Sequence, residues 1–176
     1  MSVFTIADLH LSHTTNKPMD IFGPRWENHT ERLRENWQAL VKPNDTVIIA
    51  GDISWGMRSD DALADLEFIE KLNGKKIIAK GNHDYWWQTM KKMYEMRDEI
   101  SAFSIDFLFN NAYIAENFIV CGTRGWFPES NYGPDDEKIV NREAERLRTS
   151  ILAGLKLHNV AATPRLVSIF CRNAVF

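Results

Sequence analysis

Apolar residues in the first hundred positions form short runs that alternate with longer segments in which they recur every three or four residues. The short runs are typical of buried strands, and the longer segments are typical of amphipathic helices. This pattern predicts strands at residues 3–7, 46–50 and 77–79 and helices at about 27–41, 60–72 and 85–99. Strands that alternate with helices at this spacing predict βαβ units and a parallel sheet.

The pattern changes after residue 100. Tight turns there separate three short apolar runs, which predict antiparallel strands at 105–109, 112–115 and 118–121. A long amphipathic helix is expected at about 135–157, followed by a strand at 166–170. The segment 11–26 predicts a long packed loop. Because there is no internal repeat or linker, we expect residues 1–176 to form a single domain.

Polar side chains directly follow each of the three strands predicted to be parallel. Asp8 and His10 follow the first strand. Asp52 follows the second strand, and Asn82 and His83 follow the third. Ligands bind outside the carboxyl ends of parallel strands, so we expect these side chains to converge. Carboxylate, imidazole and amide groups suit Mn, Fe or Zn, and one aspartate can bridge two such ions.

Each of these clusters also has an ordinary structural explanation when it is taken alone. A strand-end aspartate such as Asp8 often caps a turn, and Gly51-Asp52 is a common turn sequence. Residues 82–84 could equally begin the helix that follows them. It is the order of the three clusters, each after a strand, that favours a metal site.

Three other polar residues are weighed as possible contacts to a substrate or phosphate. His13 and His29 are in or beside the long loop, and we interpret them as packing or surface residues rather than substrate contacts. Arg124 follows a predicted strand and suits either a phosphate contact or a surface salt bridge.

Composition narrows the class of function. The chain is 44% hydrophobic and 26% charged with a net charge of -3, so we expect no dedicated nucleic-acid binding and no membrane association. No apolar run reaches the length of a membrane span, and strand-like sequence begins too early to allow a signal peptide. Two cysteines make no disulfide framework, which predicts a cytoplasmic location.

The ordered motifs D-x-H, G-D and G-N-H-D resemble those of the calcineurin-like metallophosphoesterase family, of the bacterial type. The resemblance implies an α/β fold in which a β-sandwich of mixed sheets is flanked by helices. It also implies hydrolysis of a small-molecule phosphate mono- or diester by a metal-activated hydroxide at a dinuclear site holding two divalent ions (Mn, Fe or Zn). The residues matched to the metal site and its catalytic group are Asp8 and His10 for the first metal, Asp52 as the bridge, Asn82 for the second metal and catalytic His83.

The resemblance implies that Asp84 orients the neighbouring loop rather than binds metal. Two departures from the family pattern change the expected activity and the expected metal site. Trp55 stands where phosphoprotein phosphatases of the superfamily have a second aspartate, which counts against a protein phosphatase. The later histidine and G-H-x-H motifs are missing, and the chain ends soon after the strand at 166–170. We therefore expect a C-terminally incomplete domain, an incomplete second sheet, and one ion held instead of two.

Two hypotheses follow. The first is an active metal-dependent phosphoesterase, and the second is a truncated remnant that is inactive or binds metal weakly. A nuclease of the same superfamily is less well supported because the chain lacks a basic stripe. An incomplete sheet would leave an exposed edge, which predicts a homodimer through that edge.

Overall fold

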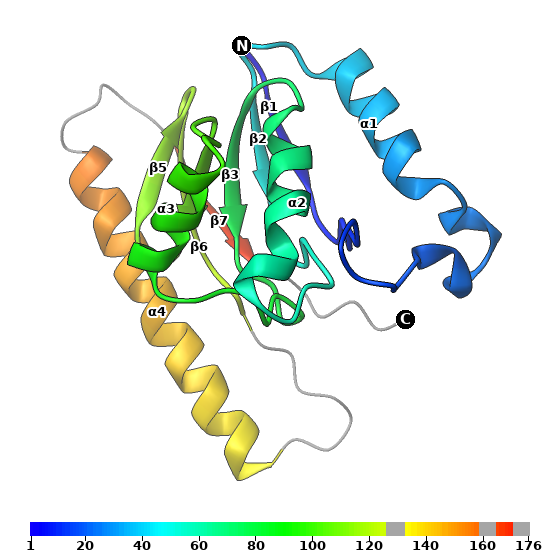
Figure 1. The fold of residues 1–176 in the computed structure, drawn as a ribbon. Coiled ribbons are helices and arrows are strands. Elements are labelled where there is room, and N and C mark those ends of the chain that lie inside the picture. The colour runs from blue at the N-terminus through cyan, green and yellow to red at the C-terminus, as the bar shows by residue number, and fades with distance from the viewer. Residues whose placement is uncertain (126–132, 159–164, 171–176) are drawn as a thin grey trace.

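The structure is a computed structural model that describes residues 1–125, 133–158 and 165–170. Two β-sheets lie against each other, and helices flank them on both sides (Figure 1). A parallel sheet packed against a mixed one, with helices on both sides, agrees with the α/β sandwich that the family resemblance implied, so the expected fold class is confirmed. Residues 171–176, where the sequence departs from the family pattern, lie outside the described residues. None of the helices in the described ranges is long and apolar enough to cross a membrane.

The first sheet has four parallel strands in chain order, β1 (Val3–Ile6), β2 (Thr46–Ile49), β3 (Lys75–Ala79) and β4 (Ile105–Leu108). The first three were predicted as parallel, and Ile6 pairs with Ile49, which pairs with Ile78. Their carboxyl ends therefore reach the same edge of the sheet. The antiparallel prediction for residues 105–109 is wrong, because a helical crossover returns the chain so that β4 runs parallel to β3.

The crossover helices of this sheet are α1 (His29–Leu40), α2 (Ser59–Glu70) and α3 (Met90–Glu99). The prediction started α3 at residue 85, but in the structure Thr89 is its N-cap and accepts a 3.4 Å hydrogen bond from the Lys92 N–H. The preceding Trp86 and Trp87 are buried in the core, so packing rather than helix propensity decides where they lie.

The second sheet contains β5 (Ala112–Ala115), β6 (Phe118–Thr123) and β7 (Arg165–Phe170) in that order. β5 and β6 are antiparallel as predicted, whereas β6 and β7 are parallel and are connected through the long helix α4 (Pro134–His158). Two short 3-10 helices, η1 (Met19–Phe22) and η2 (Pro24–Trp26), fold the long loop between β1 and α1.

Alternate residues of the central strands pack on opposite faces of the first sheet. Ile49 and Ile78 join the cluster formed with the helices, whereas Ile48 and Ile77 join the cluster formed with the second sheet. All four are 4% exposed or less. Strands that are buried on both faces read as continuous apolar runs, which is why they were detectable in the sequence.

Candidate metal centre

The backbone beyond β1 continues to pair with the backbone beyond β2. The Asp8 N–H donates to the Gly51 carbonyl over 3.1 Å, and the His10 N–H donates to the Asp52 carbonyl over 3.0 Å. A further bond of 2.9 Å joins the Leu11 N–H to the carbonyl of residue 53. These bonds hold the D-x-H and G-D segments side by side at the carboxyl edge of the sheet.

Three of the predicted metal ligands have left-handed backbone conformations. The φ angle is 57° at Asp8, 45° at His10 and 53° at Asp52. Residues other than glycine rarely occupy this region, and each instance costs on the order of 1–3 kcal/mol. Such strain is concentrated at functional sites, so its occurrence at three ligand positions supports a site here.

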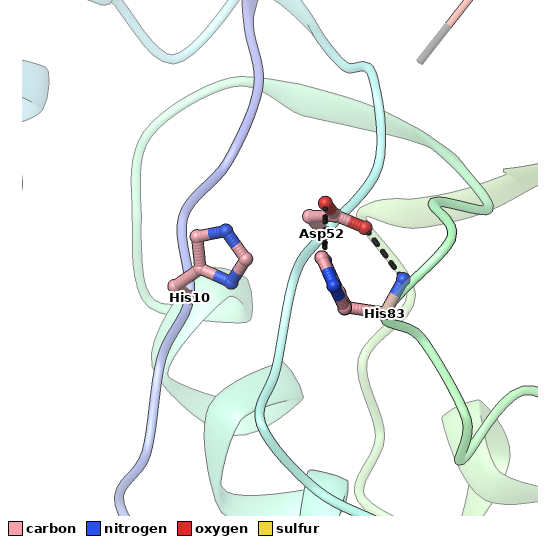
Figure 2. A group of neighbouring side chains, drawn as sticks. All are labelled: His10, Asp52 and His83. Atoms are coloured by element: carbon pink, nitrogen blue, oxygen red, sulfur yellow. Dashed lines mark hydrogen bonds and ion pairs between the residues drawn. The ribbon is translucent and has the colours of Figure 1, made fainter. Parts of the chain in front are cut away.

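His10, Asp52 and His83 form the centre of the cluster (Figure 2). One ligand atom from each lies within 4.8 Å of the others. The Nδ1 atom of His83 is 3.1 Å from Asp52 Oδ2, and the His83 backbone N–H donates to Asp52 Oδ1 over 2.9 Å. The three strand ends therefore do bring these residues together, although they are far apart in the sequence.

Asp8 and Asn82 flank this centre. Asp8 Oδ1 lies 3.8 Å from His10 Nε2, and the Asn82 amide nitrogen lies 3.2 Å from His83 Nδ1. Within the described residues, Asp8 Oδ1 and Asn82 Oδ1 are buried and accept no hydrogen bond. Buried oxygen atoms without donors are costly, and a divalent cation would satisfy both of them. The donor set thus fits the hard-to-borderline metals expected from the sequence.

The electrostatics of the cluster also fit a cation. Burial raises the pKa of Asp8, and the nearby Asp52 carboxylate raises it further, because two like charges share the site. Burial lowers the pKa of His10 to about 4, so its imidazole is neutral at pH 7 and in the form that ligates metals. A bound cation would offset the repulsion between the two carboxylates.

Asp84 holds the ligand-bearing turns together. Its Oδ2 atom accepts from the N–H groups of Asp52 (3.0 Å) and Gly81 (2.7 Å). Its Oδ1 atom accepts from the Ile53 N–H (2.8 Å) and from the Trp86 indole N–H (3.0 Å). Burial raises the pKa of Asp84 to about 6, and these donors oppose that rise. The predicted orienting role of Asp84 agrees with these contacts.

Gly81 allows the third strand end to approach the second closely. A Cβ atom at this position would lie 2.0 Å from Asp52 Oδ1 and 2.2 Å from the Asp52 backbone nitrogen. No side chain fits there without moving the bridging candidate. The glycine of the G-N-H-D motif is therefore a steric requirement for the geometry of the cluster.

Trp55 is a part of the site that the sequence did not reveal. Its ring stacks on that of His10, with centroids 4.6 Å apart and an interplanar angle of 21°. Its centroid is also 5.6 Å from that of His83, and Lys17 Nζ lies 5.3 Å from the Trp55 centroid. The available signal was the position of Trp55 three residues after Asp52, but only the fold shows which ring it covers.

Two of the other candidates pair with carboxylates outside the cluster. His13 Nδ1 is 2.6 Å from Asp65 Oδ1, which supports its interpretation as a loop-packing residue. Arg124 Nη2 lies 3.7 Å from Glu143 Oε1, the arrangement expected for the ion-pair alternative.

The sequence matches one known protein family and parts of two other proteins. A family model described as calcineurin-like phosphoesterase matches residues 1–169. The Gene 66 protein of Mycobacterium phage L5 is 35% identical over 78 residues, which are 44% of this chain and 37% of that protein. An uncharacterized protein of Methanocaldococcus jannaschii is 29% identical over 87 residues, 47% of this chain and 46% of that protein. The chain therefore matches less than half the length of each of these relatives.

Two solved structures are similar to this one, at low sequence identity. A protein of unknown function from Aquifex aeolicus has a TM-score of 0.47 and 19% identity, and the match covers 81% of this chain and 72% of that one. The phosphopantetheinyl hydrolase of Mycobacterium tuberculosis also has a TM-score of 0.47, with 17% identity, and the match covers 96% of this chain and 67% of that one.

Proposed function

Because the chain belongs to the calcineurin-like phosphoesterase family, we propose that it hydrolyses phosphate mono- or diesters in a metal-dependent reaction. The observation that carries this proposal is the convergence of His10, Asp52 and His83, whose ligand atoms lie within 4.8 Å of one another. Divalent ions bound there would act as Lewis acids on the phosphoryl oxygens and activate a water molecule.

The side chains suit different tasks in this reaction. Asp52 is central and fully buried, so we assign it as the bridge between two ions, with Asp8 and His10 on the first. Asn82 is assigned to the second ion through its buried carbonyl oxygen. Mn, Fe and Zn all suit this donor set.

His83 is assigned as the catalytic residue because of its exposure. The His10 side chain is 0% exposed, whereas that of His83 is 25% exposed and can reach a substrate. The contact between His83 Nδ1 and Asp52 Oδ2 fixes the orientation of the imidazole. We propose that His83 stabilises the phosphoryl oxygens or donates a proton to the departing alkoxide.

Hydrolysis of p-nitrophenyl phosphate and bis-p-nitrophenyl phosphate in the presence of Mn²⁺ tests this function. We expect Asp52→Asn to reduce kcat at least about a hundredfold, because the bridging charge is lost. The matched control is Asp106→Asn, which removes a carboxylate on β4 that is paired with Lys75 on β3. This variant should retain activity. Absence of turnover with every divalent metal tried would refute the proposal for this chain.

The alternative is a remnant without catalytic turnover. It is favoured by the small ligand set for the second ion, since Asn82 is its one non-bridging candidate among the described residues. Metal analysis after purification distinguishes the two. Two ions per chain would exclude the remnant, whereas one ion or none, together with no turnover, would favour it.

We also propose that two copies of the chain associate through an exposed sheet edge. β5 is an edge strand of the second sheet, and its Ile114 is 46% exposed. Light scattering at high protein concentration should detect a dimer. The substitution Ile114→Lys should shift the monomer–dimer equilibrium towards the monomer. Leu40→Lys, an equally drastic change at an exposed site on α1, is the control. A wild-type protein that stays monomeric would contradict the prediction.

A further inference from the structure

A pocket of about 420 Å³ lies between the loop after β1, which begins with the D-x-H segment, and the start of α1. Its walls come from the segment between Ser12 and Glu31, including η1 and η2. Its volume is within the range typical of small-molecule sites, about 300–1,000 Å³. The functions assigned above to the metal ligands and to His83 leave this pocket without a role.

Two residues of the pocket wall lie next to neighbours of the candidate metal ligands. The Leu9 backbone, which lies between the first two candidate ligands, is close enough to the His29 ring to partly offset the lowering of the His29 pKa by burial. The sulfur of Met19 accepts a 3.2 Å bond from the Trp55 indole N–H, and Trp55 stacks on His10. A single aromatic ring therefore separates a pocket residue from a metal-ligand candidate. A substrate with its phosphate at the cluster could extend the rest of its structure into the pocket.

The lining offers both hydrogen-bond acceptors and donors. Asp20 and Glu27 supply carboxylate oxygens, which act as acceptors. The N-terminus of α1 also lies in the wall, and the side chain of its N-cap, Asn28, makes no capping hydrogen bond. The first-turn N–H groups of the helix can then donate to a ligand. Hydroxyl groups both donate and accept, so a group that carries several of them matches this lining.

The charges and the aromatic surface of the pocket narrow the ligand class further. Among the described residues, no lysine or arginine lines the pocket, which disfavours the phosphate itself there. The third carboxylate of the lining, Glu31, is already ion-paired with Arg34. Trp26 adds an apolar face against which the C–H groups of a ring or chain can pack.

We propose that this pocket binds the hydroxyl-rich alcohol portion of the substrate, a sugar or another polyol, while the phosphate lies at the metal cluster. The inference rests on the proposed phosphoesterase function and names the substrate class for the same site. Asp20 and Glu27 would accept hydrogen bonds from the hydroxyl groups, and Trp26 would pack against the carbon skeleton. These three residues would determine specificity, and the metal ligands and His83 would perform the reaction.

The test compares the Mn²⁺-loaded protein on glucose 6-phosphate, ribose 5-phosphate, hexyl phosphate and p-nitrophenyl phosphate. A site built to bond hydroxyl groups discriminates against analogues that lack them. We expect kcat/KM for at least one sugar phosphate to exceed that for hexyl phosphate by about tenfold or more. In the double variant Asp20→Asn/Glu27→Gln this ratio should fall towards one, because both acceptors are weakened. Glu35→Gln, on α1 but outside the pocket, should retain the wild-type ratio.

The outcomes separate the two proposals. If p-nitrophenyl phosphate is hydrolysed but the sugar phosphates and hexyl phosphate react equally, the pocket proposal is overturned and the phosphoesterase function stands. If no ester is hydrolysed, saturation-transfer NMR of the metal-free protein with the same sugar phosphates decides. Transfer to the sugar protons that the double variant abolishes would support the pocket, and no transfer in the wild-type protein would overturn it.

Discussion

At the scale of single residues, the site depends on a few side chains that hold other groups in place. Asp84 is the main example, because its two oxygens bind N–H groups from both the second and the third strand ends. Gly81 is another, since any side chain there would collide with Asp52. Trp55 stacks on the His10 ring and restricts its orientation. These residues contribute by positioning the groups that would bind metal and substrate.

The role of Asp84 leads to a stability prediction. Asp84→Asn replaces one acceptor oxygen with an NH₂ group that would face buried N–H donors. We expect a loss of about 2–5 kcal/mol in the free energy of unfolding, together with weaker metal binding. Urea unfolding monitored by tryptophan fluorescence measures the first effect. Asp98→Asn, at a largely exposed carboxylate paired with Arg97, is the control and should change stability by less than about 1 kcal/mol. Equal effects of the two substitutions would contradict the assignment.

At the scale of elements, a buried lysine on β3 forms hydrogen bonds with the C-terminal end of α2. Lys76 Nζ donates to the carbonyls of Glu70 (3.2 Å) and Leu72 (2.7 Å), which lie at the C-terminus of the helix. Its side chain is fully buried, unlike that of the neighbouring Lys75. Such donors satisfy carbonyls that have no partner within the helix. The contact fixes the helix that precedes the strand carrying the G-N-H-D motif.

This contact predicts a pH dependence of stability. Burial lowers the pKa of Lys76 to about 8, below the ordinary lysine value of 10.5. Between these pH values the unfolded chain binds more protons than the folded chain, so this lysine makes stability rise with pH. We expect the wild-type protein to gain about 2 kcal/mol relative to Lys76→Met between pH 8 and 10.5. Lys75→Met should show no such difference, and the same pH profile for all three proteins would refute the prediction.

At the scale of the whole molecule, the four-stranded parallel sheet carries all the metal-ligand candidates at one edge. The second sheet packs on its other face and α4 packs on the second sheet, and neither contributes a described residue to the cluster (Figure 1). The candidate centre therefore brings together side chains from three separate segments of the chain. An ion bound there would cross-link the strand ends and stabilise the folded state of the molecule as a whole.

Metal addition should consequently raise the melting temperature. At a free Mn²⁺ concentration of one hundred times Kd the gain is about 2.7 kcal/mol, which corresponds to roughly 5–10 °C for a domain of this size. Thermal unfolding with Mn²⁺ and with EDTA measures the difference. The increase should be much smaller in Asp52→Asn, whose fold is otherwise expected to persist. An equal increase in both proteins would show that the metal binds elsewhere.

The sequence alone determined the strands of the first sheet and the residues at their ends. β2 and β3 are buried on both faces, so their apolar runs stand out without any tertiary information. The polar clusters follow immediately in the chain, and their convergence follows from the parallel arrangement. The antiparallel pairing of β5 and β6 was also detectable, because a tight turn connects these two strands.

The tertiary structure decided what depends on contacts between distant segments. The direction of β4 follows from the crossover by α3, and the start of α3 at Met90 follows from the burial of Trp86 and Trp87. The stacking of Trp55 on His10, and the pocket formed by the loop after β1, also join segments that local pattern cannot relate. Local periodicity specifies elements and the residues that follow them, whereas packing specifies which of those residues meet.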